Sequence, residues 1–103
     1  MEGLELACFE IISNVGTAKS CYINAIHKAK EGDYEEAKKL IEEGNKMYAE
    51  GHKAHMEMIQ KEASGESVET CLLLIHAEDQ MMSAETFQVL AGEFIDLCKM
   101  INK

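Results

Sequence analysis

No proline occurs in this chain of 103 residues, so no position forces a long helix to break. Ala, Leu, Ile, Met, Glu and Lys dominate the composition, as is typical of helical proteins. In the first third, apolar residues recur at alternating steps of four and three, the spacing of one buried side of a helix. They are Leu4, Cys8, Ile11, Val15, Ala18, Tyr22, Ala25 and Ala29. We therefore predict an all-α fold.

Two glycine-containing turns divide the chain into three expected helices. Gly32 suits the left-handed position after a helix end, and Asp33 can cap the next helix with Glu36 as the reciprocal partner of a capping box. Further along, Gly65 would end the second helix and Ser67 would cap the third. The prediction is a single domain, residues 1–103, forming an antiparallel three-helix bundle like a spectrin hairpin, with helices at about 2–31, 34–63 and 67–102.

The second predicted helix carries Gly44 and Gly51 on one face. Each glycine costs roughly 1 kcal/mol of helix propensity relative to alanine. Close approach of another helix would offset that cost, so we expect tight helix packing at both positions.

The third predicted helix has apolar residues on two sides. We call the first side the seam; its residues are Val68, Leu72, Ile75, Met82 and Val89. We call the second side the stripe; its residues are Leu74, Ala77, Met81, Ala84, Phe87, Ala91, Ile95 and Cys98. A three-helix chain can cover one side, and copies of the same chain most simply cover the other, so we expect an oligomer.

His76 and Asp79 lie one helical turn apart within this apolar segment. His76 falls at the edge of the seam, where a partner protein can reach it, and its neutral imidazole is a good nucleophile near pH 7. Asp79 falls inside the seam. A buried, ionised carboxylate there must find a partner, bind a cation or take up a proton.

Charge and cysteine usage exclude several other classes of protein. The chain has 10 basic and 19 acidic residues, a formal charge of −9, which argues against nucleic acid or an anionic membrane as partner. No apolar run approaches the about 20 residues that span a bilayer, and the first residues lack the features of a signal peptide. The four cysteines form no Cys-x-x-Cys pair. We expect a cytoplasmic protein with reduced, buried cysteines.

Several short motifs together resemble a known family. They are Ile11-Ile12, Gly16-x-Ala18, AKEGDYEEA at 29–37, His52, QKEASG at 60–65 and HAEDQMM at 76–82 after an aliphatic run. In order and spacing they resemble the enzyme IIA component of the lactose/cellobiose-type (lactose/N,N'-diacetylchitobiose) sugar phosphotransferase system. The resemblance extends over nearly the whole chain.

The resemblance implies a phosphotransferase component rather than a complete enzyme. His76 would take a phosphoryl group from phospho-HPr on Nε2 and pass it to a cysteine of the IIB component, for uptake of a β-linked disaccharide. Three subunits would form a nine-helix homotrimer, and their Asp79 side chains would bind Mg²⁺ or another divalent cation at the trimer axis. Gln80, four residues beyond His76, would offer an amide donor to the phosphoryl group.

The chain departs from the family pattern near this site. Where the family commonly has His-Ala-Gln-Asp-His, this sequence has Glu78 and Gln80 around Asp79, and His55 takes a place often held by glutamine. Glu78 lies about 200° around the helix from His76. Its added charge is expected to disfavour phosphohistidine slightly.

Other interpretations stay open at this point. Asp79 can be protonated or water-bridged without a metal. His52, His55, His76 and Asp79 together supply four ligands for a transition metal in a helical metal-binding bundle. Residues 29–37 also resemble the turn of a tetratricopeptide repeat, which favours an interaction module, although nothing comparable recurs at a period near 34 residues.

Overall fold

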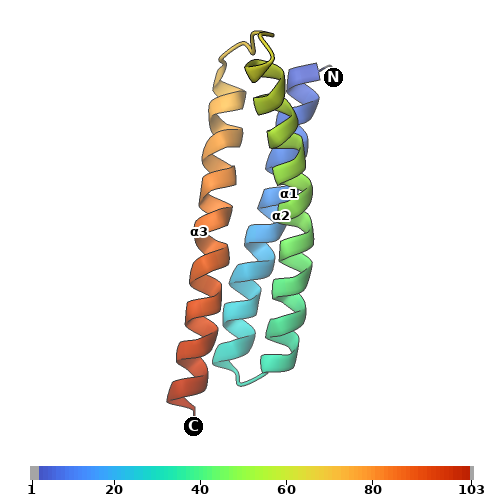
Figure 1. The fold of residues 1–103 in the computed structure, drawn as a ribbon. Coiled ribbons are helices and arrows are strands. Elements are labelled where there is room, and N and C mark those ends of the chain that lie inside the picture. The colour runs from blue at the N-terminus through green and yellow to red at the C-terminus, as the bar shows by residue number, and fades with distance from the viewer. Residues whose placement is uncertain (1–2, 103) are drawn as a thin grey trace.

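The computed structural model describes residues 3–102, and all regular structure in that range is helical. Helix α1 spans Gly3–Lys30, α2 spans Tyr34–Ala63 and α3 spans Leu72–Ile101. They form an elongated antiparallel bundle of 54 × 22 × 20 Å, with the N-terminus and the α2–α3 connection at one end (Figure 1). The predicted all-α three-helix bundle is confirmed. The first expected helical position, residue 2, lies outside the described residues.

Helix α1 supplies most of the core. It packs extensively against both α2 and α3, which contact each other far less. All but one of the residues in its predicted apolar series are buried, and Leu4 is partly buried. The largest fully buried side chains also all belong to α1; they are Tyr22, Ile11, Val15 and Cys8.

The α1–α2 turn has the predicted glycine and cap. Gly32 has a φ of 84°, and the Asp33 carboxylate accepts a hydrogen bond of 3.1 Å from the backbone N–H of Glu36. The reciprocal half of the predicted capping box is absent. The Asp33 N–H instead donates to the carbonyl of Lys28 at 2.9 Å, closing the end of α1. That N–H is therefore already satisfied without Glu36.

The predicted start of α3 at residue 67 is wrong. Gly65 ends α2 with a φ of 96°, as predicted, but residues 66–71 then run without helix and α3 begins at Leu72. The residue before it, Cys71, is extended and makes no side-chain capping bond, so Ser67 is not the cap. Extended backbone covers about 3.3 Å per residue against 1.5 Å in a helix, so a non-helical segment reaches further across the end of the bundle.

The two glycines of α2 lie where α1 approaches closely, as predicted. A Cβ atom on Gly44 would lie 2.7 Å from Cε1 of Tyr22. On Gly51 it would lie 2.6 Å from Cγ1 of Val15. Direct contact between α1 and α2 therefore offsets the helix propensity that is lost at both glycines.

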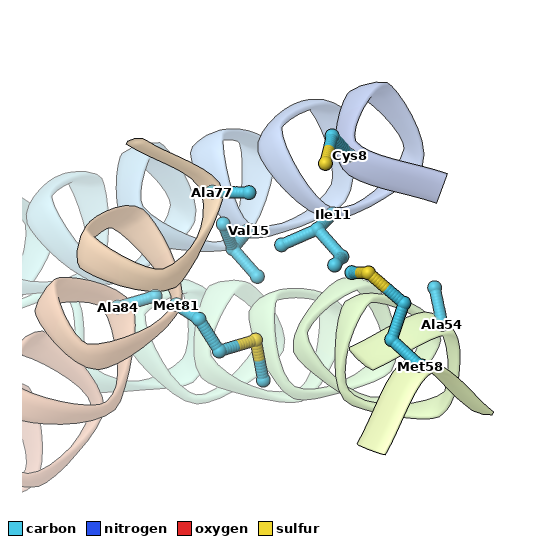
Figure 2. Close-up of a cluster of buried hydrophobic side chains, with 8 residues drawn as sticks. All are labelled: Cys8, Ile11, Val15, Ala54, Met58, Ala77, Met81 and Ala84. Atoms are coloured by element: carbon cyan, nitrogen blue, oxygen red, sulfur yellow. The ribbon is translucent and has the colours of Figure 1, made fainter. Parts of the chain in front are cut away.

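The stripe of α3 faces the other helices, and the seam is largely left open. Ala77, Met81, Ala84 and Ala91 are buried, and the other stripe residues are partly buried. Figure 2 shows the first three meeting side chains from α1 and α2 in one apolar cluster. Leu72, Ile75, Met82 and Val89 are instead each more than half exposed. One side of α3 is thus uncovered within a single chain.

Candidate functional site

His76 lies exposed near the start of α3, on a segment fixed from behind by apolar packing. Its neighbour Ala77 is fully buried, and Met81 is 4 % exposed; both belong to the cluster that contains Ile11 and Val15 (Figure 2). The helix therefore presents the imidazole on the outside while its other side is held in the core. This arrangement suits a nucleophile that another protein must reach.

His76 lines none of the four best-formed grooves of the described residues. A groove of about 600 Å³ lies at the opposite end of the bundle and is lined by residues 32–35 and 92–99 among others. A second, of about 330 Å³, lies between the start of α1, the end of α2 and residues 67–69. His76 is exposed and lies outside these grooves, where the surface of another protein can reach it.

Asp79 is also exposed, between Ile75 and Met82 of the seam. Water reaches the carboxylate in the single chain, so the expected conflict of buried charges stays a prediction for the assembled oligomer. Burial and charge repulsion at this position require a further copy of the chain over the seam. Any cation at Asp79 likewise depends on assembly.

Gln80 is partly exposed, one turn beyond His76. Within residues 3–102, neither its amide nor the His76 imidazole forms a side-chain hydrogen bond. Both groups keep their hydrogen-bonding capacity for a partner or a phosphoryl group.

A hydrogen bond that the sequence did not reveal connects α2 to α3 beside this site. Nε2 of His55 lies 2.6 Å from Oε1 of Glu78. Both residues are among the three that depart from the family pattern, and the structure brings them together. The sequence did contain one indication of this contact, because a basic and an acidic side chain replace the usual residues at two positions of the family pattern. The pairing of helices that joins them could not be inferred from spacing within one helix.

The proposed transition-metal cluster does not form. His52 is exposed and stacks on Tyr48 with ring centroids 6.2 Å apart, whereas His55 turns to Glu78. The described residues contain no group of three or more His, Cys, Asp or Glu side chains suited to a metal ion. The interpretation that combines His52, His55, His76 and Asp79 is wrong for this chain.

The four cysteines are free thiols, two buried and two partly buried. Burial raises the pKa of the Cys8 thiol, and the nearby Cys71 and Glu78 raise it further. Burial also raises the pKa of Cys21. Both thiols therefore stay protonated near neutral pH and behave as small core residues.

None of the three helices is long and apolar enough to cross a membrane, within the residues that the structure describes.

Comparison with known proteins identifies the family. Residues 6–99 match the family described as "PTS system, Lactose/Cellobiose specific IIA subunit". The lichenan-specific phosphotransferase enzyme IIA component of Bacillus subtilis is 38 % identical over 102 residues, covering 99 % of this chain and 93 % of the relative. The lactose-specific EIIA component of Staphylococcus epidermidis is 32 % identical, covering 93 % and 92 %.

Solved structures agree with this assignment. The crystal structure of the PTS cellobiose-specific enzyme IIA from Bacillus anthracis superposes with a TM-score of 0.94 at 39 % identity, covering 99 % of this chain and 94 % of that one. PtcA from S. mutans gives a TM-score of 0.89 at 33 % identity, covering 96 % and 99 %. The chain therefore belongs to the lactose/cellobiose-specific enzyme IIA family of the sugar phosphotransferase system.

Proposed function

We propose that this protein is a phosphohistidine carrier that accepts a phosphoryl group from phospho-HPr on His76 and transfers it to a cysteine of a IIB component. The observation that carries the proposal is the exposure of His76 at the outer side of α3, in the sequence segment that matches the family. Such a relay would operate in the cytoplasm, between other protein components of the sugar transport system.

The transfer requires little of this chain beyond positioning. The lone pair of neutral His76 Nε2 attacks phosphorus as the bond from phosphorus to its carrier atom on HPr breaks. In the second step the IIB thiolate attacks the same phosphorus, and the bond to Nε2 breaks. Buried Ala77 and Met81 hold the helix behind His76, and the Gln80 amide is available to donate to a phosphoryl oxygen.

The uncovered seam supports assembly into a homotrimer. Its exposed apolar side chains would be removed from water by two further copies of the chain. One Asp79 from each subunit would then lie within the interface. Hard carboxylate oxygens fit Mg²⁺, so Asp79 is the residue that would hold a divalent cation there. A bound divalent cation would offset two of the three carboxylate charges, and no step of the proposed phosphoryl transfer requires it.

The transported sugar is proposed only by class. Relatives of similar identity carry names that specify lichenan, oligo-beta-mannoside and lactose. These names point to β-linked sugars, and we propose a β-linked disaccharide or short oligosaccharide.

Incubation with phosphoenolpyruvate, enzyme I and HPr tests the function directly. The expected product is an acid-labile, base-stable phosphoryl adduct on one histidine per chain. It should be absent from His76→Ala and retained in His27→Ala and His52→Ala, which alter other exposed histidines. Label that persists in His76→Ala, or that maps to another histidine, rejects the assignment.

A further inference from the structure

The start of α3, which carries His76, has little polar support. The preceding residues 66–71 are irregular, and Cys71 makes no side-chain capping bond. The first N–H groups of a helix have no partner inside the helix, so an uncapped start is prone to fray. Packing of Ala77 and Met81 holds this region from the α1 side.

The His55–Glu78 bond is the polar contact that holds the same region from the α2 side. The His55 side chain is 15 % exposed and that of Glu78 is 45 % exposed. An ionised carboxylate only accepts hydrogen bonds, so Nε2 of His55 carries the hydrogen and donates it to Oε1. Bonds of this kind to a charged group are stronger than those between neutral groups.

No other side-chain hydrogen bond or ion pair joins residues 72–86 to another helix in the described part of the chain. The next such contact along α3 is the 2.8 Å bond from Gln88 to Asn45. The last is the 3.0 Å bond to Tyr34 from Asn102, the residue directly after α3. Direct packing between α2 and α3 is sparse. Loss of the His55–Glu78 bond therefore leaves the His76 segment without polar attachment to α2.

The same bond fixes the direction of a charge. Glu78 lies two residues after His76, about 200° around the helix. Its bond to His55 keeps the carboxylate on the α2 side of α3. The carboxylate therefore points away from His76 and shares its charge with a hydrogen-bond donor. Both effects reduce the electrostatic repulsion expected between Glu78 and an anionic phosphohistidine.

We infer that His55 and Glu78 are positioning residues for His76. The pair holds the first turns of α3 against α2 and keeps the Glu78 carboxylate away from the imidazole. Its consequence for phosphoryl transfer rests on the proposed function, whereas the positioning itself does not.

Amide hydrogen exchange and the ring ¹⁵N signals of His76 test the positioning without phosphorylation. In His55→Ala and in Glu78→Ala, exchange of residues 75–80 should accelerate about 3- to 10-fold, the range expected for a partly exposed charged hydrogen bond. Exchange of residues 92–98 should stay unchanged, and the His76 signals should shift. Glu93→Ala, which removes an exposed carboxylate from the same helix, is the control and should change neither readout at 75–80.

The double variant His55→Gln/Glu78→Gln tests whether the contact matters rather than the individual residues. Two amides can restore a hydrogen bond, so exchange at 75–80 and the His76 signals should return toward wild type. Wild-type behaviour of both alanine variants would overturn the inference. So would a double glutamine variant that is as perturbed as the alanine variants.

Transfer kinetics add the functional consequence. In each alanine variant, kcat for phosphorylation by phospho-HPr should fall about 3- to 10-fold at unchanged KM, because the His76 position changes while the docking surface does not. An unchanged kcat in variants with accelerated exchange would overturn the positioning role in transfer. Failure of the wild-type protein to accept phosphate would instead reject the proposed function, and the exchange result would still decide whether the pair positions α3.

Discussion

The hydroxyl of Tyr22 donates a 2.8 Å hydrogen bond to Oδ1 of Asn45, and the same oxygen accepts a 2.8 Å bond from Gln88. Asn45 thus connects all three helices through one atom. Tyr22 is fully buried, so its hydroxyl depends on this contact more than the exposed Asn45 does. These directional hydrogen bonds fix how the three helices align along their axes in the middle of the bundle, which apolar packing alone does not specify.

Asn45→Ala should lower the free energy of unfolding by about 1–3 kcal/mol, because it removes the acceptor of two hydrogen bonds and leaves the buried Tyr22 hydroxyl unpaired. Urea denaturation monitored by circular dichroism measures this change. Lys46→Ala alters the neighbouring exposed position and should stay within about 0.5 kcal/mol of wild type. Equal effects of both variants would show that the network contributes nothing specific.

Burial raises the pKa of Tyr22 to about 12, outweighing the nearby Gln88 amide, which lowers it. The native state therefore favours the protonated phenol, and its stabilising effect is complete below the ordinary tyrosine value of 10.0. It is lost as pH rises from there toward about 12. Unfolding measured across this range should show a steeper loss of stability in wild type than in Tyr22→Phe. Parallel pH curves would contradict this assignment.

The helices, both glycine turns and the close contacts at Gly44 and Gly51 followed from the sequence, because each depends on local backbone geometry or on periodicity within one helix. The start of α3 did not follow. Ser67 has the chemistry of a cap, but residues 66–71 are not helical and connect α2 to α3 across the end of the bundle (Figure 1). Local preference at Ser67 was overridden by that tertiary constraint.

The candidate site was predicted residue by residue, but its environment was not. Periodicity indicated two apolar sides of α3 without indicating which one faces α1. The structure shows that the stripe does, so Asp79 lies on the side that stays exposed in the single chain. The contact between His55 and Glu78 was missed for the same reason, since pairing across helices depends on their relative rotation.

Gly51→Ala should destabilise the protein although alanine is the better helix former. The new Cβ would lie 2.6 Å from Cγ1 of buried, β-branched Val15, which has little freedom to move. Overpacking costs about 1–3 kcal/mol and should exceed the about 1 kcal/mol of propensity gained. Gly16→Ala, whose Cβ meets nothing within 4 Å, is the matched control and should be neutral or stabilising in thermal unfolding.

A charged substitution in the seam tests the proposed trimer, because it should disrupt assembly without unfolding the single chain. Val89→Glu places a carboxylate on an exposed apolar position, so the single chain should stay helical while the assembly dissociates. Ile59→Glu, a similar change at an exposed position on α2, should leave the trimer intact. Light scattering at micromolar concentration measures the mass. A monomeric wild-type protein would reject the trimer, and dissociation by Ile59→Glu would place the interface elsewhere.

Asp79→Leu tests the proposed role of Asp79 as an axial ligand. Removing one member of a buried charge arrangement is often costly, but replacing every symmetry-related copy by an apolar residue of similar size can be neutral or stabilising. The variant should therefore remain a folded trimer, lose Mg²⁺ binding by calorimetry and still accept phosphate on His76. Asp96→Asn, which neutralises another exposed carboxylate of α3, should keep Mg²⁺ binding. Retained Mg²⁺ binding in Asp79→Leu would show that Asp79 is not the ligand. A folded variant that no longer accepts phosphate would assign Asp79 to the transfer site itself, because one turn of helix separates it from His76.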